Sequence, residues 1–309
     1  MTRRGSLPSA LLALAAVIWG FAFVAQRAGM DYVGPFLFNG VRFLLGALIL
    51  LPMVAIWRRR RVSIPSVPIS PLAAVVGCTL AGLVLFGAVS LQQMGIVHTT
   101  AGKAGFITGL YVVIIPFLGL LRGQRIRWTV WLGVLCAAAG LYLLSIRGAL
   151  GIEFGDGLVL VGAFGWAVHV QLIGWLAERV RPLAIAVAQF AICGLISLAV
   201  GLAAETATLG GLSDAAWPIA YAGILSTGVA YTLQIVGQRR VDPTRAGIIF
   251  SMEAVFAVLG GWLLLGEAMT LRMLGGCALM LAAMVLAQLR RGQRRGALDG
   301  RRATSQSEQ

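Results

Sequence analysis

Charged residues are scarce in this sequence. They make up 12% of its 309 residues, whereas a typical soluble domain has about 25%. Hydrophobic residues make up 59%, and the mean hydropathy is +0.89. Too few polar groups remain to cover a water-facing surface. This excludes a soluble enzyme or binding domain and predicts an all-α integral membrane protein.

The residue types that carry most enzyme chemistry are also rare. The two histidines, His98 and His169, are expected at different membrane depths, and no HExxH, GxSxG or paired-aspartate motif accompanies them. The sole lysine, Lys103, belongs to the fourth apolar segment, whereas a retinal-binding receptor needs a lysine in a late helix. A P-loop for ATP-driven transport is absent as well. We therefore expect no enzyme activity, no metal and no cofactor.

Acidic residues are outnumbered by basic ones, 11 against 25, which gives a net charge of +14. In a soluble protein this excess would suggest nucleic acid as a partner. Here the basic residues form short runs between apolar segments, and no aromatic residues are interleaved with them. They are better interpreted as signals of membrane topology, with the lipid bilayer and no nucleic acid as partner.

Long apolar runs dominate the remainder. A helix needs about 20 apolar residues to cross the ~30 Å hydrocarbon core of a bilayer. The sequence predicts ten such transmembrane helices, at about 9–28, 35–57, 71–94, 101–121, 128–146, 157–176, 183–204, 216–237, 245–265 and 270–289. Residues 291–309 are polar and basic, and we expect them to form a disordered cytoplasmic tail.

The distribution of basic residues predicts the orientation. With the N-terminus inside, twenty basic residues lie on the cytoplasmic side. The opposite side has four, namely Arg27, Lys103, Arg147 and Arg272. This asymmetry follows the positive-inside rule. It predicts a multi-pass protein of the cell (inner) membrane with both termini in the cytoplasm.

The two halves of the sequence resemble each other. KAGFITGLYVV, at 103–113, aligns without a gap on RAGIIFSMEAV, at 245–255, which places Tyr111 opposite Glu253. In the same register LQQMG, at 91–95, matches LQIVG, at 233–237. Each half has five predicted spans, so the second half must enter the membrane with the opposite polarity. We therefore predict two inverted-topology five-helix repeats, 1–148 and 155–290, an arrangement typical of secondary transporters.

Four stretches carry a family resemblance, in order along the chain: WGFAF, VRF, AGFITGLYVVIIPFLGLL and SMEAVFAVLGGWLLLGEAMT. With these the chain resembles EamA-type members of the drug/metabolite transporter superfamily. That family usually has Glu-Pro where this chain has Glu253-Ala254. The resemblance implies a ten-helix carrier of small organic metabolites, which often moves them outward and often by proton exchange.

Polar groups inside apolar helices are costly, so they mark candidate functional positions. Glu253 is interpreted either as a proton-coupling or cation-binding carboxylate, or as a structural residue paired with Arg42 or a backbone donor. Arg42 would bind a substrate carboxylate or neutralise Glu253, and His169 would carry protons or pack. The others would contact substrate or join helices. The predicted pathway residues are Glu253, Tyr111, Arg42, His169, Gln92, Gln234, Gln189, Tyr231, Trp19 and Trp166.

The function predicted from these features is secondary active transport by alternating access. We expect export of small organic metabolites such as amino acids or amines, with proton coupling and with a monomer or homodimer as the working unit. The alternative is an intramembrane lipid-handling protein or enzyme. Two further expectations are a kink at Pro116 and a solvated position for Glu267 at the external end of its helix.

Overall fold

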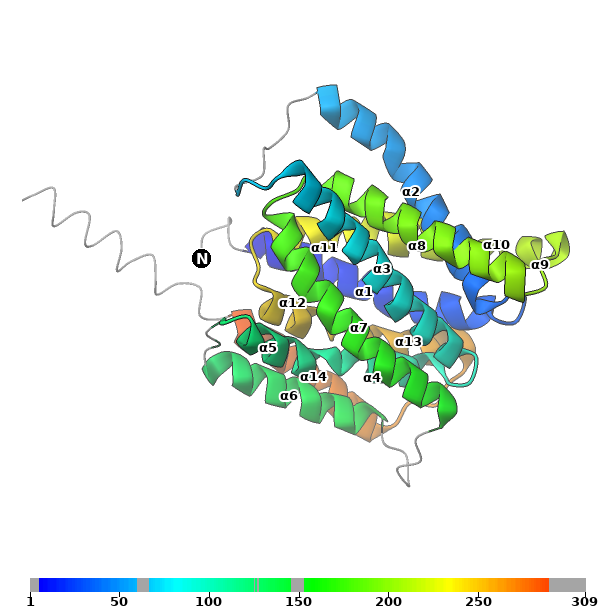
Figure 1. Cartoon of the computed structure of the whole chain (residues 1–309). Coiled ribbons are helices and arrows are strands. Elements are labelled where there is room, and N and C mark those ends of the chain that lie inside the picture. Colours follow the sequence, from blue (N-terminus) through cyan, green and yellow to red (C-terminus); the bar gives the residue numbers. More distant parts are fainter. Residues whose placement is uncertain (1–5, 60–66, 125, 127, 146–152, 289–309) are drawn as a thin grey trace, which may run out of the picture.

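The structure, a computed structural model, describes residues 6–59, 67–124, 126, 128–145 and 153–288 (Figure 1). Every regular element in these ranges is helical, and they contain no strand. The predicted tail and the basic residues at positions 3, 4, 60, 61, 125, 127 and 147 lie outside the described residues. The elements are α1 (Ser6–Gly29), α2 (Pro35–Arg59), α3 (Pro71–Ile96), α4 (Ala101–Gly109), α5 (Tyr111–Leu121), α6 (Trp128–Ser145), α7 (Phe154–Ala177), α8 (Pro182–Ala204), α9 (Leu209–Asp214), α10 (Ala216–Ala220), η1 (Tyr221–Ala230), α11 (Tyr231–Gln238), α12 (Pro243–Phe250), α13 (Glu253–Leu265) and α14 (Leu271–Gln288).

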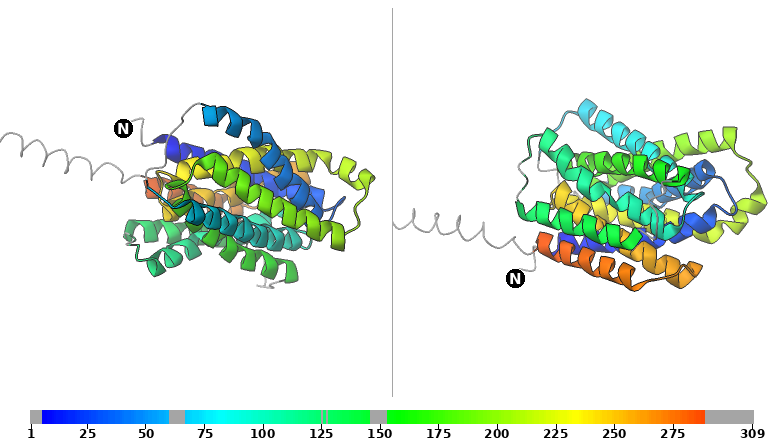
Figure 2. Two further views of the ribbon diagram at one scale, coloured as in Figure 1. Left: turned by 45° about the horizontal axis from the view of Figure 1, so that its top comes forward. Right: turned by 90° about the horizontal axis from the view of Figure 1, so that it is seen from below.

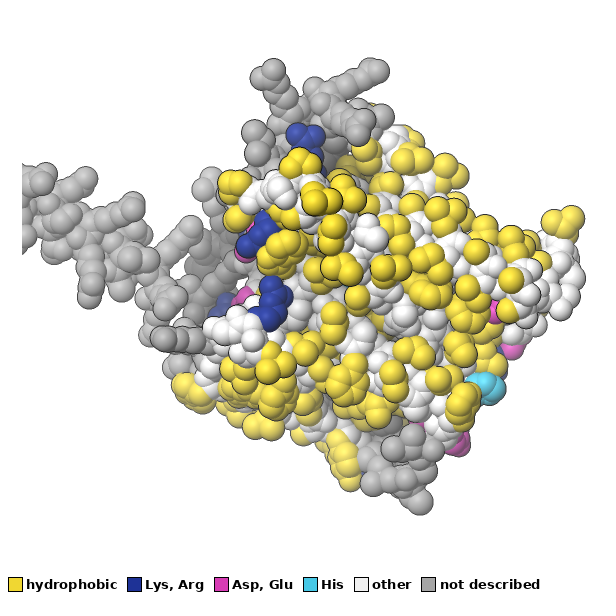
Figure 3. Space-filling model, in the orientation of Figure 1, with side chains coloured by type: hydrophobic (Ala, Val, Ile, Leu, Met, Phe, Trp, Pro, Cys, Tyr) yellow, Lys and Arg dark blue, Asp and Glu magenta, His cyan; other side chains and the backbone are white. Residues whose placement is uncertain are grey.

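Within the described ranges, eight helical segments are long and apolar enough to cross a membrane. Two shorter apolar helices, Val130–Gly140 and Leu271–Ala283, coincide with the fifth and tenth predicted spans. Large apolar side chains, such as Leu72, Leu121 and Leu271, are widely exposed around the bundle, and Figure 3 displays them as a broad apolar surface. Such a surface is stable in lipid and unfavourable in water.

The helices pack mainly against partners that are distant in sequence. α2 lies along α8, α3 along α7, α6 along α14, and α1 along both α13 and η1. Figure 2 gives two further views of this bundle. Because these pairs join the first half of the chain to the second, the two halves interdigitate and share one core.

Three of the spans are not continuous α-helices. One divides into α4 and α5 at Leu110, another divides into α12 and α13 at Ser251 and Met252, and the span from Ala216 to Gln238 contains the ten-residue π-helix η1. The break near Glu253 therefore forms with Ala254 in place of proline. The fourth predicted span is interrupted at Leu110, where the backbone N–H bonds to the oxygens of Ile107 and Thr108, while Pro116 lies inside α5.

The two ends of the bundle differ in charge. α1 begins and α14 ends at the same end of the bundle (Figure 1), and Figure 3 displays basic side chains gathered at that end. We call this the basic end, defined by Arg122, Arg179, Arg239 and Arg240. The opposite end, the acidic end, is defined by Asp31, Glu153, Asp156, Glu205 and Glu267.

Candidate functional site

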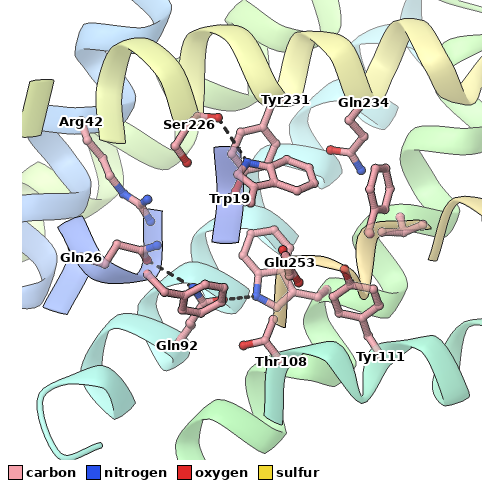
Figure 4. A pocket seen from close by; sticks show the side chains of 14 residues that line it. Trp19, Gln26, Arg42, Gln92, Thr108, Tyr111, Ser226, Tyr231, Gln234 and Glu253 are labelled. Carbon is pink, nitrogen blue, oxygen red and sulfur yellow. Dashed lines mark hydrogen bonds between the residues drawn. The ribbon is translucent and has the colours of Figure 1, made fainter. Parts of the chain in front are cut away.

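A cavity lies at the centre of the bundle, where both halves of the chain meet (Figure 4). Its empty volume is about 470 Å³, of which about 40 Å³ is open to the centres of water-sized molecules. That is room for a few waters, so this conformation encloses the site too tightly for a larger organic molecule. The lining residues are Trp19, Phe23, Gln26, Arg42, Gln92, Thr108, Tyr111, Trp166, Val170, Ser226, Tyr231, Gln234, Phe250 and Glu253.

Eight of the ten residues predicted for the pathway line this cavity. The other two, His169 and Gln189, are fully buried and share a hydrogen bond of 2.8 Å between His169 Nε2 and Gln189 Oε1. The His169 ring contacts Trp166 and Tyr231 edge-on, with centroids 5.8 and 6.2 Å away. This pair thus lies behind the aromatic wall and supports it.

Glu253 is the first residue of α13, and only 5% of its surface is exposed. The first N–H groups of this half-helix are bonded within the break, since those of Ala254 and Val255 donate to the backbone oxygens of Ser251 and Met252 at 3.1 and 3.0 Å. Tyr111, its counterpart in the sequence repeat, lines the same cavity. In the described part of the chain, Glu253 Oε1 has no hydrogen-bond partner. One carboxylate oxygen is therefore left for a ligand in the cavity.

Arg42 is 2% exposed and lies on a different side of the cavity from Glu253 (Figure 4). Its Nε donates to Asn39 Oδ1 at 2.9 Å, and its guanidinium lies over the Phe43 ring, 4.7 Å from the centroid. Among the described residues it forms no salt bridge with Glu253, so the pairing considered from the sequence is wrong in this conformation. The aromatic contact and Asn39 stabilise the cation instead, which leaves terminal N–H groups facing the cavity.

Two glutamines at equivalent positions of the repeat have different partners. Gln92 is fully engaged: its Oε1 accepts from Trp166 Nε1 at 2.6 Å, and its Nε2 donates to Gln26 Oε1 at 3.2 Å. Gln234 Oε1 has no hydrogen-bond partner among the described residues, although the atom is buried. An unpaired buried acceptor costs about 1–3 kcal/mol. A bound molecule that donates to it would recover that cost.

Aromatic rings form the walls of the cavity. Trp19 meets Tyr231 and Phe250 edge-on, with centroids 4.9 and 5.3 Å apart, and Trp166 stacks on Tyr231 at 6.2 Å. The Trp19 indole N–H donates to the backbone oxygen of Ser226, 3.2 Å away, in the π-helix η1. The walls are thus fixed by their own contacts and do not need a substrate to order them.

Sequence reasoning missed several lining residues, of which Gln26, Thr108 and Ser226 are the polar ones. Gln26 lies seven residues after Trp19 and Thr108 three before Tyr111, so helical periodicity alone puts each on the cavity-facing side. Ser226 had no such signal, because it belongs to a π-helix whose turn differs from that of an α-helix.

A second, wider cavity opens at the basic end, with an accessible volume of about 390 Å³. We call it the vestibule; its side chains include Arg122, Arg179, Arg239, Gln171 and Gln238. Figure 3 displays basic side chains around a hollow at this end.

The partition between the vestibule and the central cavity is thin. Gln238 Nε2 donates at 3.0 Å to the backbone oxygen of Val170, a residue that lines the central cavity. Gln171 Nε2 donates at 2.9 Å to the backbone oxygen of Ile115. Two amide side chains thus join the helices across this partition, with neutral hydrogen bonds that are individually weak.

Several known proteins that are similar to this chain are named transporters. The model of the EamA-like transporter family matches residues 7–146 and again 153–289. An uncharacterized transporter of Archaeoglobus fulgidus is 31% identical over 90% of this chain and 85% of its own length. The uncharacterized transporter YoaV of Bacillus subtilis is 25% identical over 85% and 90% of the two chains.

A third relative gives the membrane setting. The uncharacterized inner membrane transporter YedA of Escherichia coli is 26% identical over 82% of this chain and 81% of its own. A crystal structure that is 20% identical covers 92% of this chain and 97% of the other with a TM-score of 0.74, which shows a shared fold. Together with the apolar helices, these matches make the protein a multi-pass membrane protein. The chain belongs to the EamA-like transporter family.

Proposed function

We propose that this protein is a secondary active transporter that exports small organic metabolites, such as amino acids or amines, by alternating access. The observation that carries the proposal is the central cavity, which both halves enclose and which holds a carboxylate, a guanidinium and aromatic walls. Isolated charges at membrane depth are costly and usually serve transport pathways. The names of the relatives support a transporter as well.

The packing supports the inverted repeat and ten spans as the basis of this mechanism. If the halves are related by a two-fold axis in the membrane plane, the equivalent pairs are α2 with α8 and α6 with α14, and each pair is in contact. The α1 contact with η1 and α11 corresponds in the same way to the α3 contact with α7. Both broken spans, α4/α5 and α12/α13, are interrupted directly before Tyr111 and Glu253, the aligned pair. Discontinuous helices at a repeat interface are typical binding sites of secondary transporters.

The unpaired groups define the chemistry of the substrate. Glu253 Oε1 and Gln234 Oε1 need hydrogen-bond donors, and an organic ammonium group supplies them. Arg42 supplies donors that match a carboxylate. An α-amino acid satisfies both groups at once, and an amine satisfies the acceptors alone. The aromatic walls suit an apolar side chain or the face of a ring.

The proposed orientation has the basic end in the cytoplasm, since the basic residues outnumber those of the opposite end. The vestibule then opens inwards and exposes the route to the central cavity from the cytoplasm. Glu253 is the proposed proton-coupling group, because it alone among the cavity residues named above is a carboxylate.

Transport by purified protein tests the proposal. In proteoliposomes with an imposed pH gradient, we expect counterflow of at least one member of a panel of amino acids, amines and sugars, and accumulation that follows the gradient. Empty liposomes give the background. No counterflow across the whole panel, with movement of a fluorescent lipid between leaflets instead, would favour the lipid-handling alternative and overturn the proposal.

A further inference from the structure

Two glutamates at the acidic end join the halves of the protein. Glu205, directly after α8, reaches the start of α2, where its Oε1 accepts from the Phe36 N–H at 2.9 Å and its Oε2 from the Leu37 N–H at 2.8 Å. The first N–H groups of a helix have no partner inside the helix. A carboxylate that accepts two of them gains charge-assisted hydrogen bonds and the favourable field of the helix dipole.

Glu267 forms the same arrangement elsewhere at this end. It follows α13, and its Oε1 and Oε2 accept from the backbone N–H groups of Ala101 and Gly102 at the start of α4, at 3.1 and 3.4 Å. Its side chain is half-buried. The solvated position expected for Glu267 from the sequence is therefore wrong, because the turn after α13 directs it back across the helix ends.

Glycines create the space for both carboxylates. A methyl group at Gly34 would overlap the Glu205 carboxyl, and one at Gly261 would overlap that of Glu267. Gly266 has φ of +68°, a conformation that favours glycine, and it ends α13 so that the Glu267 N–H bonds back to the Gly261 oxygen. The backbone at both places is thus shaped around the acidic side chain.

Each carboxylate joins a predicted span to the equivalent span of the other half, the span of α8 to that of α2 and the span of α12 and α13 to that of α4 and α5. Glu205 extends from α8 to α2, and Glu267 from α13 to α4. An ion pair with one buried member lies at the same end: Nζ of the partly exposed Lys103 in α4 is 2.6 Å from the buried carboxylate of Asp156 in α7.

The basic end lacks this arrangement in its described part. There the start of α12 is capped locally, since Asp242 accepts from Arg245 N–H at 3.0 Å. Arg122, directly after α5, donates to Gln171 and not to the start of α12. At the acidic end two carboxylates therefore bond to the starts of helices of the other half, whereas the vestibule end is joined by the hydrogen bonds of Gln171 and Gln238 and by those from Arg122 to Gln171.

We propose that Glu205 and Glu267 form a carboxylate latch that holds the acidic end closed while the vestibule is open. Both carboxylates must release the starts of α2 and α4 before the central cavity can open towards the acidic end. They are positioning residues for transport and do not touch the substrate. This inference rests on the proposed function, since it assumes that the two ends open in alternation.

The test measures from which side the central cavity is reached. In a chain whose four cysteines are replaced by Ala, Thr108→Cys places a thiol in the cavity, and a membrane-impermeant maleimide is added to one side of oriented vesicles at a time. Glu205→Gln and Glu267→Gln are then introduced singly and together. We expect the ratio of labelling rates, acidic-end side over basic-end side, to rise about fivefold for each single variant, the effect typical of losing one helix cap, and further for the double variant.

Two sets of variants separate the latch from a general loss of stability. Gly34→Ala and Gly261→Ala displace the carboxylates without removing their charge, and we expect the same rise in the ratio. Asp214→Asn and Gly210→Ala, at exposed positions of α9 at the same end, should leave it unchanged. An unchanged ratio in the glutamate and glycine variants would overturn the latch, as would rates that increase equally from both sides.

The labelling experiment needs no substrate. If the protein moves no metabolite in liposomes but the ratio rises as expected, the proposed function fails and the latch is retained as a structural device. If transport is measured but the ratio does not change, the latch alone is wrong.

Discussion

Replacing Glu253 with Gln is expected to abolish proton-driven accumulation while exchange of substrate across the membrane continues. Gln keeps an oxygen at the position of Glu253 Oε1, so the substrate still finds an acceptor, but the side chain no longer binds and releases a proton. Accumulation ratios in proteoliposomes should fall to 1 within error, whereas counterflow should decrease by less than about tenfold, since one neutral hydrogen bond replaces a charge-assisted one. The pH dependence of counterflow should disappear with the carboxylate.

A matched substitution separates this carboxylate from the other titratable group nearby. His169→Gln retains a hydrogen-bonding partner for Gln189 behind the aromatic wall, so we expect it to preserve both accumulation and the pH profile. If Glu253→Gln accumulates substrate with an unchanged response to pH, Glu253 is a structural residue. If His169→Gln abolishes the response instead, the coupling group is the histidine.

Arg42→Gln should weaken the transport of substrates that have a carboxylate much more than that of substrates that lack one. The guanidinium is the cavity group that matches a carboxylate, and it is supported by Asn39 and the Phe43 ring rather than by an acidic partner. Loss of a bidentate charge-assisted pair should raise the KM for α-amino acids by about 10- to 100-fold. The corresponding amines, which lack the carboxylate, should change by less than about threefold, because Arg42 does not contact them.

The comparison of each amino acid with its own amine is the internal control, since both share the apolar side chain and the ammonium group. Arg42→Lys provides a second one: it keeps the charge but loses the planar fork, so intermediate values are expected. Equal losses for amino acids and amines would mean that Arg42 stabilises the cavity without binding the carboxylate. Fluorescence-detected elution profiles of all variants identify any that fail to fold.

Much of this architecture follows from the sequence because hydropathy and repeat alignment are local signals. The apolar runs predicted helical spans, and the alignment of Tyr111 with Glu253 predicted positions that share one cavity. Gln92 and Gln234 were found in the same way. The depth of a residue in the membrane can be estimated by counting along its predicted span. Polar residues at equivalent positions of the two halves then indicate the depth at which the site lies.

The remaining features depend on how each helix is rotated about its own axis and on contacts between residues that are far apart in the sequence. Sequence could not reveal that His169 faces Gln189 and not the cavity, because the buried and the exposed faces of α7 are both apolar, the exposed one through Val161, Phe164 and Val168. The separation of Arg42 from Glu253 depends on how α2 and α13 are placed around the cavity. The position of Glu267 was predicted wrongly because its partners, Ala101 and Gly102, lie 166 and 165 positions away in the sequence. A local sequence pattern does not show that a carboxylate will accept hydrogen bonds from such distant backbone N–H groups.

The thin partition formed by Gln171 and Gln238 bears on the fraction of unloaded molecules whose central site is accessible from the vestibule. A transporter binds its cargo only in the fraction of molecules whose site faces the cargo, and its apparent affinity weakens in proportion to that fraction. In the proposed orientation, the carboxylate contacts at the acidic end would bias the unloaded population towards the state whose site faces the cytoplasm. An exporter of this kind would bind cargo at low cytoplasmic concentration with close to its intrinsic affinity, whereas cargo on the other side would find few molecules with an accessible site. The bias would change how fast cargo loads from each side, while the electrochemical gradients would still set the direction of net flux.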